Sequence, residues 1–361
     1  IMNYKIFADE NIPFLANALR HTGNFTQFKG RELNRSKLSE SGCNILFVRS
    51  TTKVNEELLH GTDVKFVATA TSGTDHIDEE YLSGKGIAFY SAAGSNANSV
   101  AEYVVYSILK WAGLRNFDLN EKSIGIIGYG NIGRQVAKYC QLLGLKVYVN
   151  DPPLTDAGLL FPHSVNPIRL HDLLRLSDII TNHVPLNPYG KYKTIGLLGK
   201  KEIDLVKENS LIIHASRGGI ADEQALIGLN AMGINLVIDT WANEPIVNTS
   251  LAADCLLATP HIAGYSRDGK VRGAAMVLAA FTDFTGIMPE MGGIDCELKK
   301  YSPLSEDYYN NASQLLLLLE KSRQFSADHK EFISTMNKNS KERAILFDKL
   351  RKEYPERHEI L

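Results

Sequence analysis

The feature that most constrains this 361-residue chain is the glycine-rich segment SIGIIGYGNIGR at residues 123–134. An apolar run of strand length precedes its glycines, and residues 135–143 have helical composition. In a G-x-G-x-x-G pattern at such a junction, the first glycine permits a tight turn and the second lets backbone N–H groups approach a pyrophosphate. The third allows close packing of the helix on the sheet. The pattern is therefore typical of a dinucleotide-binding turn. We expect the bound dinucleotide to lie against Gly128, Tyr129, Gly130, Asn131, Ile132 and Gly133.

An acidic residue follows the next predicted strand. The apolar run at 146–150 ends at Asp151, 23 residues after Gly128. A carboxylate at this distance hydrogen-bonds the ribose hydroxyls and repels a 2′-phosphate, so the pattern favours NAD over NADP. A glycine turn without a ligand and a different adenine-containing ligand stay open as alternatives.

Strand-length apolar runs alternate with helical segments along the chain, which is typical of parallel sheets covered by helices on both faces. The first series of predicted strands comprises residues 5–8, 45–48, 66–69 and 87–90. The second series comprises 123–127, 146–150, 179–182, 211–214, 236–239 and 256–259.

Two local sequence signals indicate domain boundaries within this α/β pattern. A capping box at Ser99 opens a helix, and glycines and a proline interrupt the chain at 286–293. We therefore expect a first domain at 1–98, completed by a helix at 268–286, and a second domain at 99–267. Residues 287–361 are expected to form a small, mostly helical module set apart from both.

Composition excludes several classes of function. The 39 basic and 41 acidic residues give a net charge of −2, which argues against binding nucleic acid or anionic membranes through bulk charge. The four cysteines form no C-x-x-C or C-x-x-H pairing, so we expect no metal site. Unpaired cysteines fit a reducing compartment, and we expect a cytoplasmic protein.

Three further segments, each at the end of a predicted strand, carry groups suited to moving a hydride and a proton. Arg217 lies in SRGG, Glu244 in WANEP and His261 in TPHIAGY. A histidine can take the hydroxyl proton of a secondary alcohol, and a carboxylate on its other ring nitrogen fixes the tautomer. An arginine can bind a substrate carboxylate through two hydrogen bonds. Each residue alone has an ordinary structural explanation, whereas their shared position behind the glycine turn favours a joint site.

These three motifs, in this order, resemble the Arg/Glu/His triad of the D-isomer-specific 2-hydroxyacid dehydrogenases. The stretch SDIITNHVPL at 177–186 is similar to the same family. The resemblance implies a Rossmann-type NAD domain, a flavodoxin-like substrate domain and NAD-dependent oxidation of a 2-hydroxy acid. It also implies cofactor contacts from Val184, Asp239 and Gly264.

A narrower resemblance covers essentially the whole chain. DENIP at 9–13, VRSTTKVN at 48–55, TATSGTDH at 69–76, DPP at 151–153 and FDKLRK at 347–352 resemble one branch of this family. That branch oxidises 4-phospho-D-erythronate to the 2-oxo acid on the route to pyridoxal 5′-phosphate, and it carries a C-terminal dimerisation domain. The resemblance therefore implies a homodimer. His214 and Ser216 occupy positions where the resemblance implies asparagine and cysteine or another small residue, and we expect His214 to be a hydrogen-bonded histidine at a strand end.

A substrate with a carboxylate and a phosphate needs two anion sites. The backbone of Ser72 and Gly73 can form an anion nest, and Arg49, with Lys53 nearby, suits a phosphate. An ordinary solvated pair is the alternative for these two cations. The resemblance adds substrate contacts from Ser50, Thr71 and Tyr265.

Two other functions stay open. One is a D-2-hydroxyacid dehydrogenase of other specificity, such as D-3-phosphoglycerate dehydrogenase. The other is an NAD-sensing binding protein, because transcriptional co-repressors use the same fold.

Overall fold

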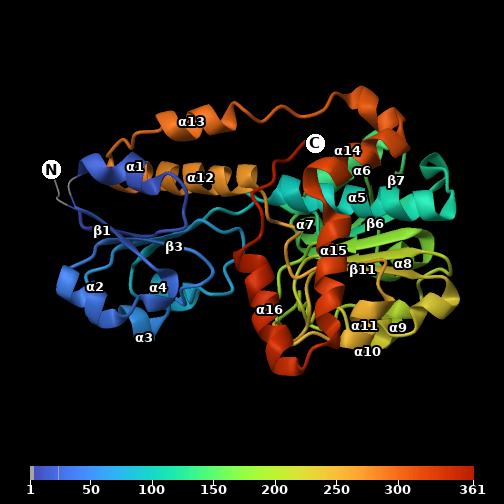
Figure 1. Ribbon diagram of the computed structural model, residues 1–361, viewed down its shortest axis with the longest axis horizontal. Helices are drawn as coiled ribbons and strands as arrows, with labels where there is room; N and C mark the ends of the chain where they lie inside the picture. The colour runs from blue at the N-terminus through green and yellow to red at the C-terminus, as the bar shows by residue number, and fades with distance from the viewer. Residues whose placement is uncertain (1–3, 23) are drawn as a thin grey trace. The chain divides into compact units, whose positions relative to one another are not determined.

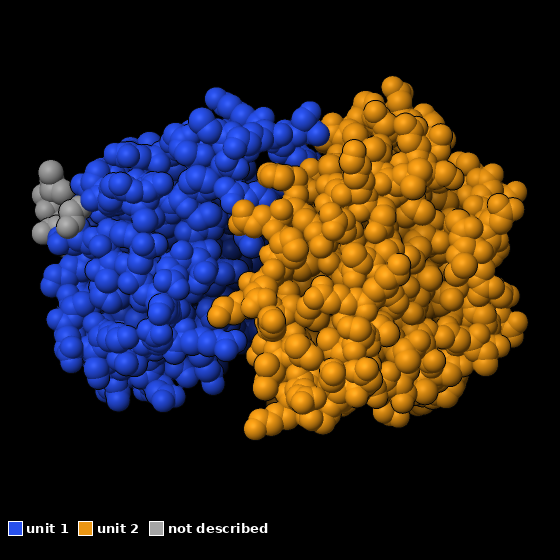
Figure 2. Space-filling view, viewed as in Figure 1, with its two compact units in different colours: residues 1–96, 266–302 blue, residues 97–265, 303–361 orange. Residues whose placement is uncertain are grey.

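The computed structural model describes residues 4–22 and 24–361. The chain divides into two compact units, coloured separately in Figure 2. Unit 1 combines the chain up to Asn96 with Ser266–Ser302, and unit 2 combines Ala97–Tyr265 with Pro303–Leu361.

Unit 1 is built on a parallel sheet that has five strands among the described residues, in the order β2-β1-β3-β4-β5. This order is flavodoxin-like. The strands are β1 (Ile6–Asp9), β2 (Phe25–Phe28), β3 (Ile45–Val48), β4 (Phe66–Thr69) and β5 (Ala88–Ser91). The sequence pattern missed β2, because this edge strand buries only its last residue and so lacks an apolar run.

Helices cover both faces of this sheet (Figure 1). One face packs against α1 (Leu15–Leu19) and α12 (Arg267–Thr285), and the other face packs against α2 (Arg35–Ser41), α3 (Glu56–Leu59) and α4 (Glu79–Gly84). The long helix α12 returns to unit 1 after the whole of the second sheet, and Phe281 on it packs against Phe47 of β3. Helix α13 (Gly292–Leu298) follows it in the same unit.

Unit 2 contains the second parallel sheet, with seven strands in the described chain, in the order β12-β11-β10-β9-β6-β7-β8. The strand order reverses between β6 and β9, which makes their carboxyl ends the switch point of a doubly wound fold. The strands are β6 (Ser123–Ile127), β7 (Lys146–Asn150), β8 (Asn166–Pro167), β9 (Ile179–Asn182), β10 (Leu211–His214), β11 (Asn235–Ile238) and β12 (Leu257–Ala258).

The helices of unit 2 form two layers around its sheet (Figure 1). On one face lie α5 (Ala97–Arg115) and α6 (Asn131–Leu142), and on the other lie α8 (Leu170–Leu176), α9 (Lys200–Ile203), α10 (Glu223–Leu226) and α11 (Thr249–Asp254). The short helix α7 (Pro152–Asp156) follows β7.

The C-terminal tail does not form a unit of its own. Its helices α14 (Ala312–Arg323), α15 (Phe325–Ser334) and α16 (Ser340–Lys352) belong to unit 2, whereas residues up to Ser302 belong to unit 1. Arg323 is fully buried and forms an ion pair with the fully buried Glu102 of α5. Phe325 packs edge-on against Tyr103. The breakers at 286–293 indicated a boundary in the sequence, but they could not show where the tail's buried side chains would pack.

Candidate active site

The glycine turn lies at the carboxyl end of β6, at the switch point of the larger sheet. Gly128 has a φ of 92°, and a Cβ there would lie 2.8 Å from both the carbonyl oxygen of His183 and Cγ1 of Val184. A Cβ on Gly133 would overlap the carbonyl oxygen of Gly128, so only glycine lets α6 approach the turn this closely. The expected Val184 therefore lies against the turn.

Gly130 differs from its two neighbours in the motif. It is the N-cap residue of α6, provides no capping side chain, and has no described atom within 4 Å of an added Cβ. The N-terminus of this helix is therefore open to an anionic group, which the helix dipole favours. Asn131 and Ile132 begin the helix, while the Tyr129 ring is buried against Phe161. The turn fits the pyrophosphate of NAD.

Asp151 stands beside the same turn. Its Oδ2 accepts a hydrogen bond from the Tyr129 backbone N–H at 2.7 Å, and its Oδ1 accepts one from Leu154 N–H at 3.0 Å. The carboxylate is thus fixed between the turn and the start of α7. Its contact with the ribose stays a prediction.

Asp239 follows β11 and holds the loop that carries the candidate histidine. Its Oδ1 accepts from Thr259 Oγ1 and from Ile262 N–H, both at 2.7 Å, and its Oδ2 accepts from Ala263 N–H at 3.0 Å. Burial raises the pKa of this carboxyl. The structure therefore gives Asp239 a role in positioning residues 259–263, just before Gly264. Its expected cofactor contact stays a prediction.

His261 and Glu244 form a hydrogen-bonded pair. Nδ1 of His261 lies 2.8 Å from Oε2 of Glu244, and Oε1 of Glu244 accepts from the Trp241 backbone N–H at 2.9 Å. His261 has a φ of 57°, which a non-glycine residue adopts at a cost of about 1–3 kcal/mol. Nε2 of His261 has no hydrogen-bond partner within the described chain, so this nitrogen is available to a substrate.

The surroundings of Glu244 favour its ionised form. Burial alone raises the pKa of Glu244, but the hydrogen bond and charge of His261, the Trp241 N–H and the positive charge of Arg351 together lower it. An ionised carboxylate on Nδ1 stabilises the imidazolium form of His261 and leaves its proton on Nδ1 when the ring is neutral.

Arg217 follows β10, which lies beside β11 in the sheet. Its Nη1 donates to the Ser216 carbonyl oxygen at 2.8 Å. A Cβ on the adjacent Gly218 would overlap the carbonyl oxygen of Trp241, so the glycine allows the Arg217 loop to contact the Glu244 loop. Unit 2 thus brings Arg217, Glu244 and His261 to neighbouring strand ends, together with Tyr265.

His214 is buried and hydrogen-bonded at the end of β10, as expected from the sequence. Its Nδ1 lies 3.0 Å from the Asn182 amide nitrogen on the adjacent β9, and Ser216 donates to Oδ1 of the same asparagine. Burial lowers the pKa of His214 to about 4, with smaller effects from Glu244, Arg217 and His261. His214 is therefore neutral at neutral pH. Sequence reasoning missed Asn182 as its partner, because the two positions are joined only by strand pairing.

In unit 1, the predicted substrate residues follow the carboxyl ends of two neighbouring strands of the smaller sheet. Arg49 and Ser50 follow β3, and Thr71, Ser72 and Gly73 follow the neighbouring β4. Thr71 Oγ1 lies 2.7 Å from Thr69 Oγ1 and donates to the Gly73 carbonyl oxygen at 3.0 Å. Ser72 Oγ accepts from Gly94 N–H at 3.0 Å.

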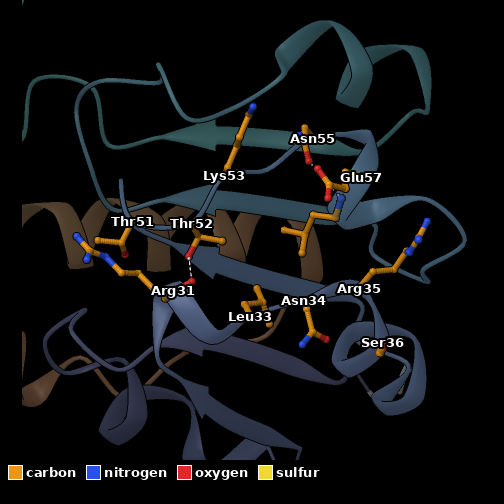
Figure 3. Close-up of a pocket in the computed structure, with 12 residues that line it drawn as sticks. Arg31, Leu33, Asn34, Arg35, Ser36, Thr51, Thr52, Lys53, Asn55 and Glu57 are labelled. Carbon is orange, nitrogen blue, oxygen red and sulfur yellow. Dashed lines mark hydrogen bonds between the residues drawn. The ribbon is translucent and has the colours of Figure 1, made fainter. Parts of the chain in front are cut away.

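A cavity of about 420 Å³ opens beside β3 (Figure 3). The expected Lys53 lines it together with Arg31 and Arg35. Thr52 Oγ1 donates to the Gly30 carbonyl oxygen at 3.0 Å and joins the two segments that form the wall. Sequence reasoning missed Arg31 and Arg35 because they follow the edge strand β2, which the apolar pattern did not predict.

Within residues 4–22 and 24–361, no group of three or more histidine, cysteine, aspartate or glutamate side chains could hold a metal ion. No helix in the described part of the chain is long and apolar enough to cross a membrane.

Residues 97–263 match the family model of the D-isomer specific 2-hydroxyacid dehydrogenase, NAD binding domain. Relatives named erythronate-4-phosphate dehydrogenase, from Escherichia coli O1:K1 and from Proteus mirabilis strain HI4320, are each 37% identical to this chain. Each match covers 98% of this chain and 92% of the relative. The chain belongs to the erythronate-4-phosphate dehydrogenase family.

The crystal structure of D-lactate dehydrogenase from Aquifex aeolicus, complexed with NAD and lactic acid, is also similar. Its TM-score is 0.63 at 23% identity, covering 78% of this chain and 95% of that chain. This likeness concerns the fold. Membership of the erythronate-4-phosphate dehydrogenase family confirms the predicted resemblance, the α/β fold and the NAD-dependent dehydrogenase class, and the matched domain confirms NAD as the cofactor. The roles of single residues stay predictions.

Proposed function

We propose that the chain oxidises 4-phospho-D-erythronate at carbon 2 to (R)-3-hydroxy-2-oxo-4-phosphooxybutanoate, a step on the route to pyridoxal 5′-phosphate. The oxidation removes a hydride from carbon 2 and a proton from its hydroxyl group. NAD, when bound over the turn at 128–133, supplies the hydride acceptor.

The proton goes to His261. Nε2 takes the proton of the carbon-2 hydroxyl while Glu244, hydrogen-bonded to Nδ1, stabilises the imidazolium that forms. In the reverse direction the same nitrogen donates the proton. Asp239 positions this histidine through the loop that it holds.

The remaining residues bind the two ends of the acid. Arg217 binds the carboxylate and polarises the oxygen at carbon 2, and the backbone of Ser72 and Gly73 also serves the carboxylate. Ser50 and Arg49 bind the phosphate. Thr71 and Tyr265 complete the substrate contacts.

The observation that carries this proposal is the His261–Glu244 pair with a free Nε2, in a chain 37% identical to its named relatives over nearly its whole length. The test is NADH formation by the purified protein with a panel of phosphorylated and unphosphorylated 2-hydroxy acids. We expect 4-phospho-D-erythronate to be the best substrate. A better rate with 3-phospho-D-glycerate would favour the other dehydrogenase, and negligible turnover with NAD-dependent partner binding would favour the co-repressor-like protein.

The proposal includes a homodimer formed through the tail. Leu317 of α14 is 70% exposed and Ile345 of α16 is 60% exposed, which gives the tail apolar side chains for a second copy. Sedimentation velocity should show a dimer that Leu317→Glu or Ile345→Glu weakens. Leu160→Glu, at a 92% exposed leucine outside the tail, is the matched control. A dimer unaffected by both tail variants would contradict the tail interface.

The proposed location is the cytoplasm. It is supported by the four cysteines, all of which are free thiols in the structure. Recovery of the protein in a membrane or secreted fraction after cell fractionation would contradict it.

A further inference from the structure

The last helix of the tail ends beside the candidate active site. Phe347 of α16 packs against Phe332 of α15, and Phe332 packs against Trp241, three residues before Glu244. Just beyond α16, Tyr354 packs edge-on against Tyr265, with ring centroids 5.7 Å apart. Figure 1 shows α15 and α16 as neighbouring helices at the end of the chain. These contacts bring the end of α16 to the loops that carry Glu244 and Tyr265.

Arg351 presents its positive charge to this site. Its guanidinium carbon lies 5.9 Å from the centroid of the Tyr265 ring and 5.7 Å from that of Phe347. Its charge reaches Glu244, where it is one of the effects that lower the carboxyl pKa. Arg351 thus belongs to the same cluster as a predicted substrate residue, Tyr265, and the predicted partner of the acid–base histidine.

Among the residues that the structure describes, the Arg351 guanidinium has no anionic partner in an ion pair. Nε of Arg351 is buried without a hydrogen-bond partner, and no described carboxylate forms an ion pair with this residue. Its neighbours differ, because Lys349 pairs with Glu353 at 3.9 Å and Arg357 pairs with Asp328 at 2.6 Å. A buried N–H donor without an acceptor costs stability, and a bound anion would remove that cost.

We propose that Arg351 binds the phosphate group of the substrate beside Tyr265, so that the C-terminal tail supplies part of the substrate site. The inference rests on the proposed function. A phosphate monoester carries a charge of about −1.5 to −2 at neutral pH, and the planar guanidinium can donate two parallel hydrogen bonds to it. Arg217 already serves the carboxylate at the other end of the acid, so Arg351 gives unit 2 a second cation for the second anion.

The first test compares two substrates in two variants. Arg351→Gln should raise KM for 4-phospho-D-erythronate about 10- to 100-fold, because a hydrogen bond between charged groups is lost. It should lower kcat/KM for unphosphorylated D-erythronate much less, because that acid has no phosphate for Arg351 to bind. Arg351→Lys should recover part of the loss, because it keeps the charge without the two-pronged geometry. Lys352→Gln removes a positive charge from the next position, which is exposed. It should leave KM and kcat/KM unchanged for both substrates. An equal loss for both substrates would overturn the proposal, since Arg351 would then act through Glu244 or the carboxylate.

The second test does not depend on turnover. Calorimetric titration of the full chain with inorganic phosphate should show binding that Arg351→Gln weakens and Lys352→Gln retains. Thermal denaturation curves verify that the wild type and the Arg351→Gln variant are both folded. Equal phosphate affinity in these two proteins would overturn the proposal. Failure of the wild type to oxidise 4-phospho-D-erythronate would refute the proposed function instead, and the titration would still decide whether Arg351 binds phosphate.

Discussion

At the scale of single residues, His261 combines a strained backbone with an oriented side chain. Its positive φ is unfavourable for a histidine, and its Nδ1 is held by Glu244. Sequence motifs predicted Arg217, Glu244 and His261, because each motif lies at a strand end behind the glycine turn, and the structure places His261 and Glu244 in hydrogen-bond contact. They could not reveal Arg351, because its contact with Tyr265 links positions 86 residues apart through packing of the tail.

Replacing His261 tests its assigned role. His261→Ala should lower kcat about 100- to 10,000-fold, the usual contribution of a general acid–base group, while the Kd for NADH changes less than about twofold. Steady-state kinetics and a fluorescence titration with NADH measure the two quantities. His163→Ala, at an exposed histidine, is the control. Turnover by His261→Ala close to that of the wild type would show that another group takes the proton.

His214 gives a prediction about acid stability. Because folding lowers its pKa from 6.5 to about 4, the unfolded chain binds a proton that the folded chain excludes between these values. The free energy of unfolding should therefore fall as pH drops from about 6.5 to about 4, by up to about 3 kcal/mol from this residue. In His214→Asn this part of the pH dependence should vanish, as measured by urea unfolding at several pH values. The same slope in both proteins would refute a buried, neutral His214.

At the scale of elements, the strand–turn–helix at the switch point was the most predictable part of the fold. Its buried strand, its glycines and its helix all follow from local sequence. The strand β2 was not predictable in the same way, because only Phe28 in it is buried and its pairing with β1 provides the remaining stability.

Two glycines of this turn should respond differently to the same substitution. Gly133→Ala places a Cβ onto the Gly128 carbonyl oxygen and should lower the free energy of unfolding by about 1–3 kcal/mol. Gly130→Ala meets no described atom and should leave stability nearly unchanged, yet weaken NADH binding because its Cβ enters the space needed by the pyrophosphate. Thermal denaturation and NADH titration of both variants check this. Unaltered NADH affinity in Gly130→Ala would contradict binding at the turn.

At the scale of the whole molecule, the three tail helices α14, α15 and α16 are part of unit 2, which contains the glycine turn. Arg323 donates to the Ser99 hydroxyl and to the Tyr265 carbonyl oxygen, both at 2.8 Å, besides its ion pair with Glu102. The sequence showed a leucine-rich helix and basic residues there. It could not show that one arginine would enter the core, because its acidic partner lies 221 residues earlier in the chain.

Breaking this buried ion pair should be costly. Glu102→Gln leaves the Arg323 charge buried without its partner and should lower the free energy of unfolding by about 3–5 kcal/mol. Replacing both residues, as in the double variant Glu102→Gln/Arg323→Met, should recover most of that loss. Urea unfolding of the three proteins provides the measurement. A single variant as stable as the wild type would contradict a role of the tail in holding unit 2 together.

The most direct test of the account is the substrate preference of the purified full chain. With NAD as acceptor, kcat/KM for 4-phospho-D-erythronate should exceed that for 3-phospho-D-glycerate by at least about 100-fold, because the site is proposed to fix both anionic ends of the longer acid. An equal or higher kcat/KM for 3-phospho-D-glycerate would contradict it.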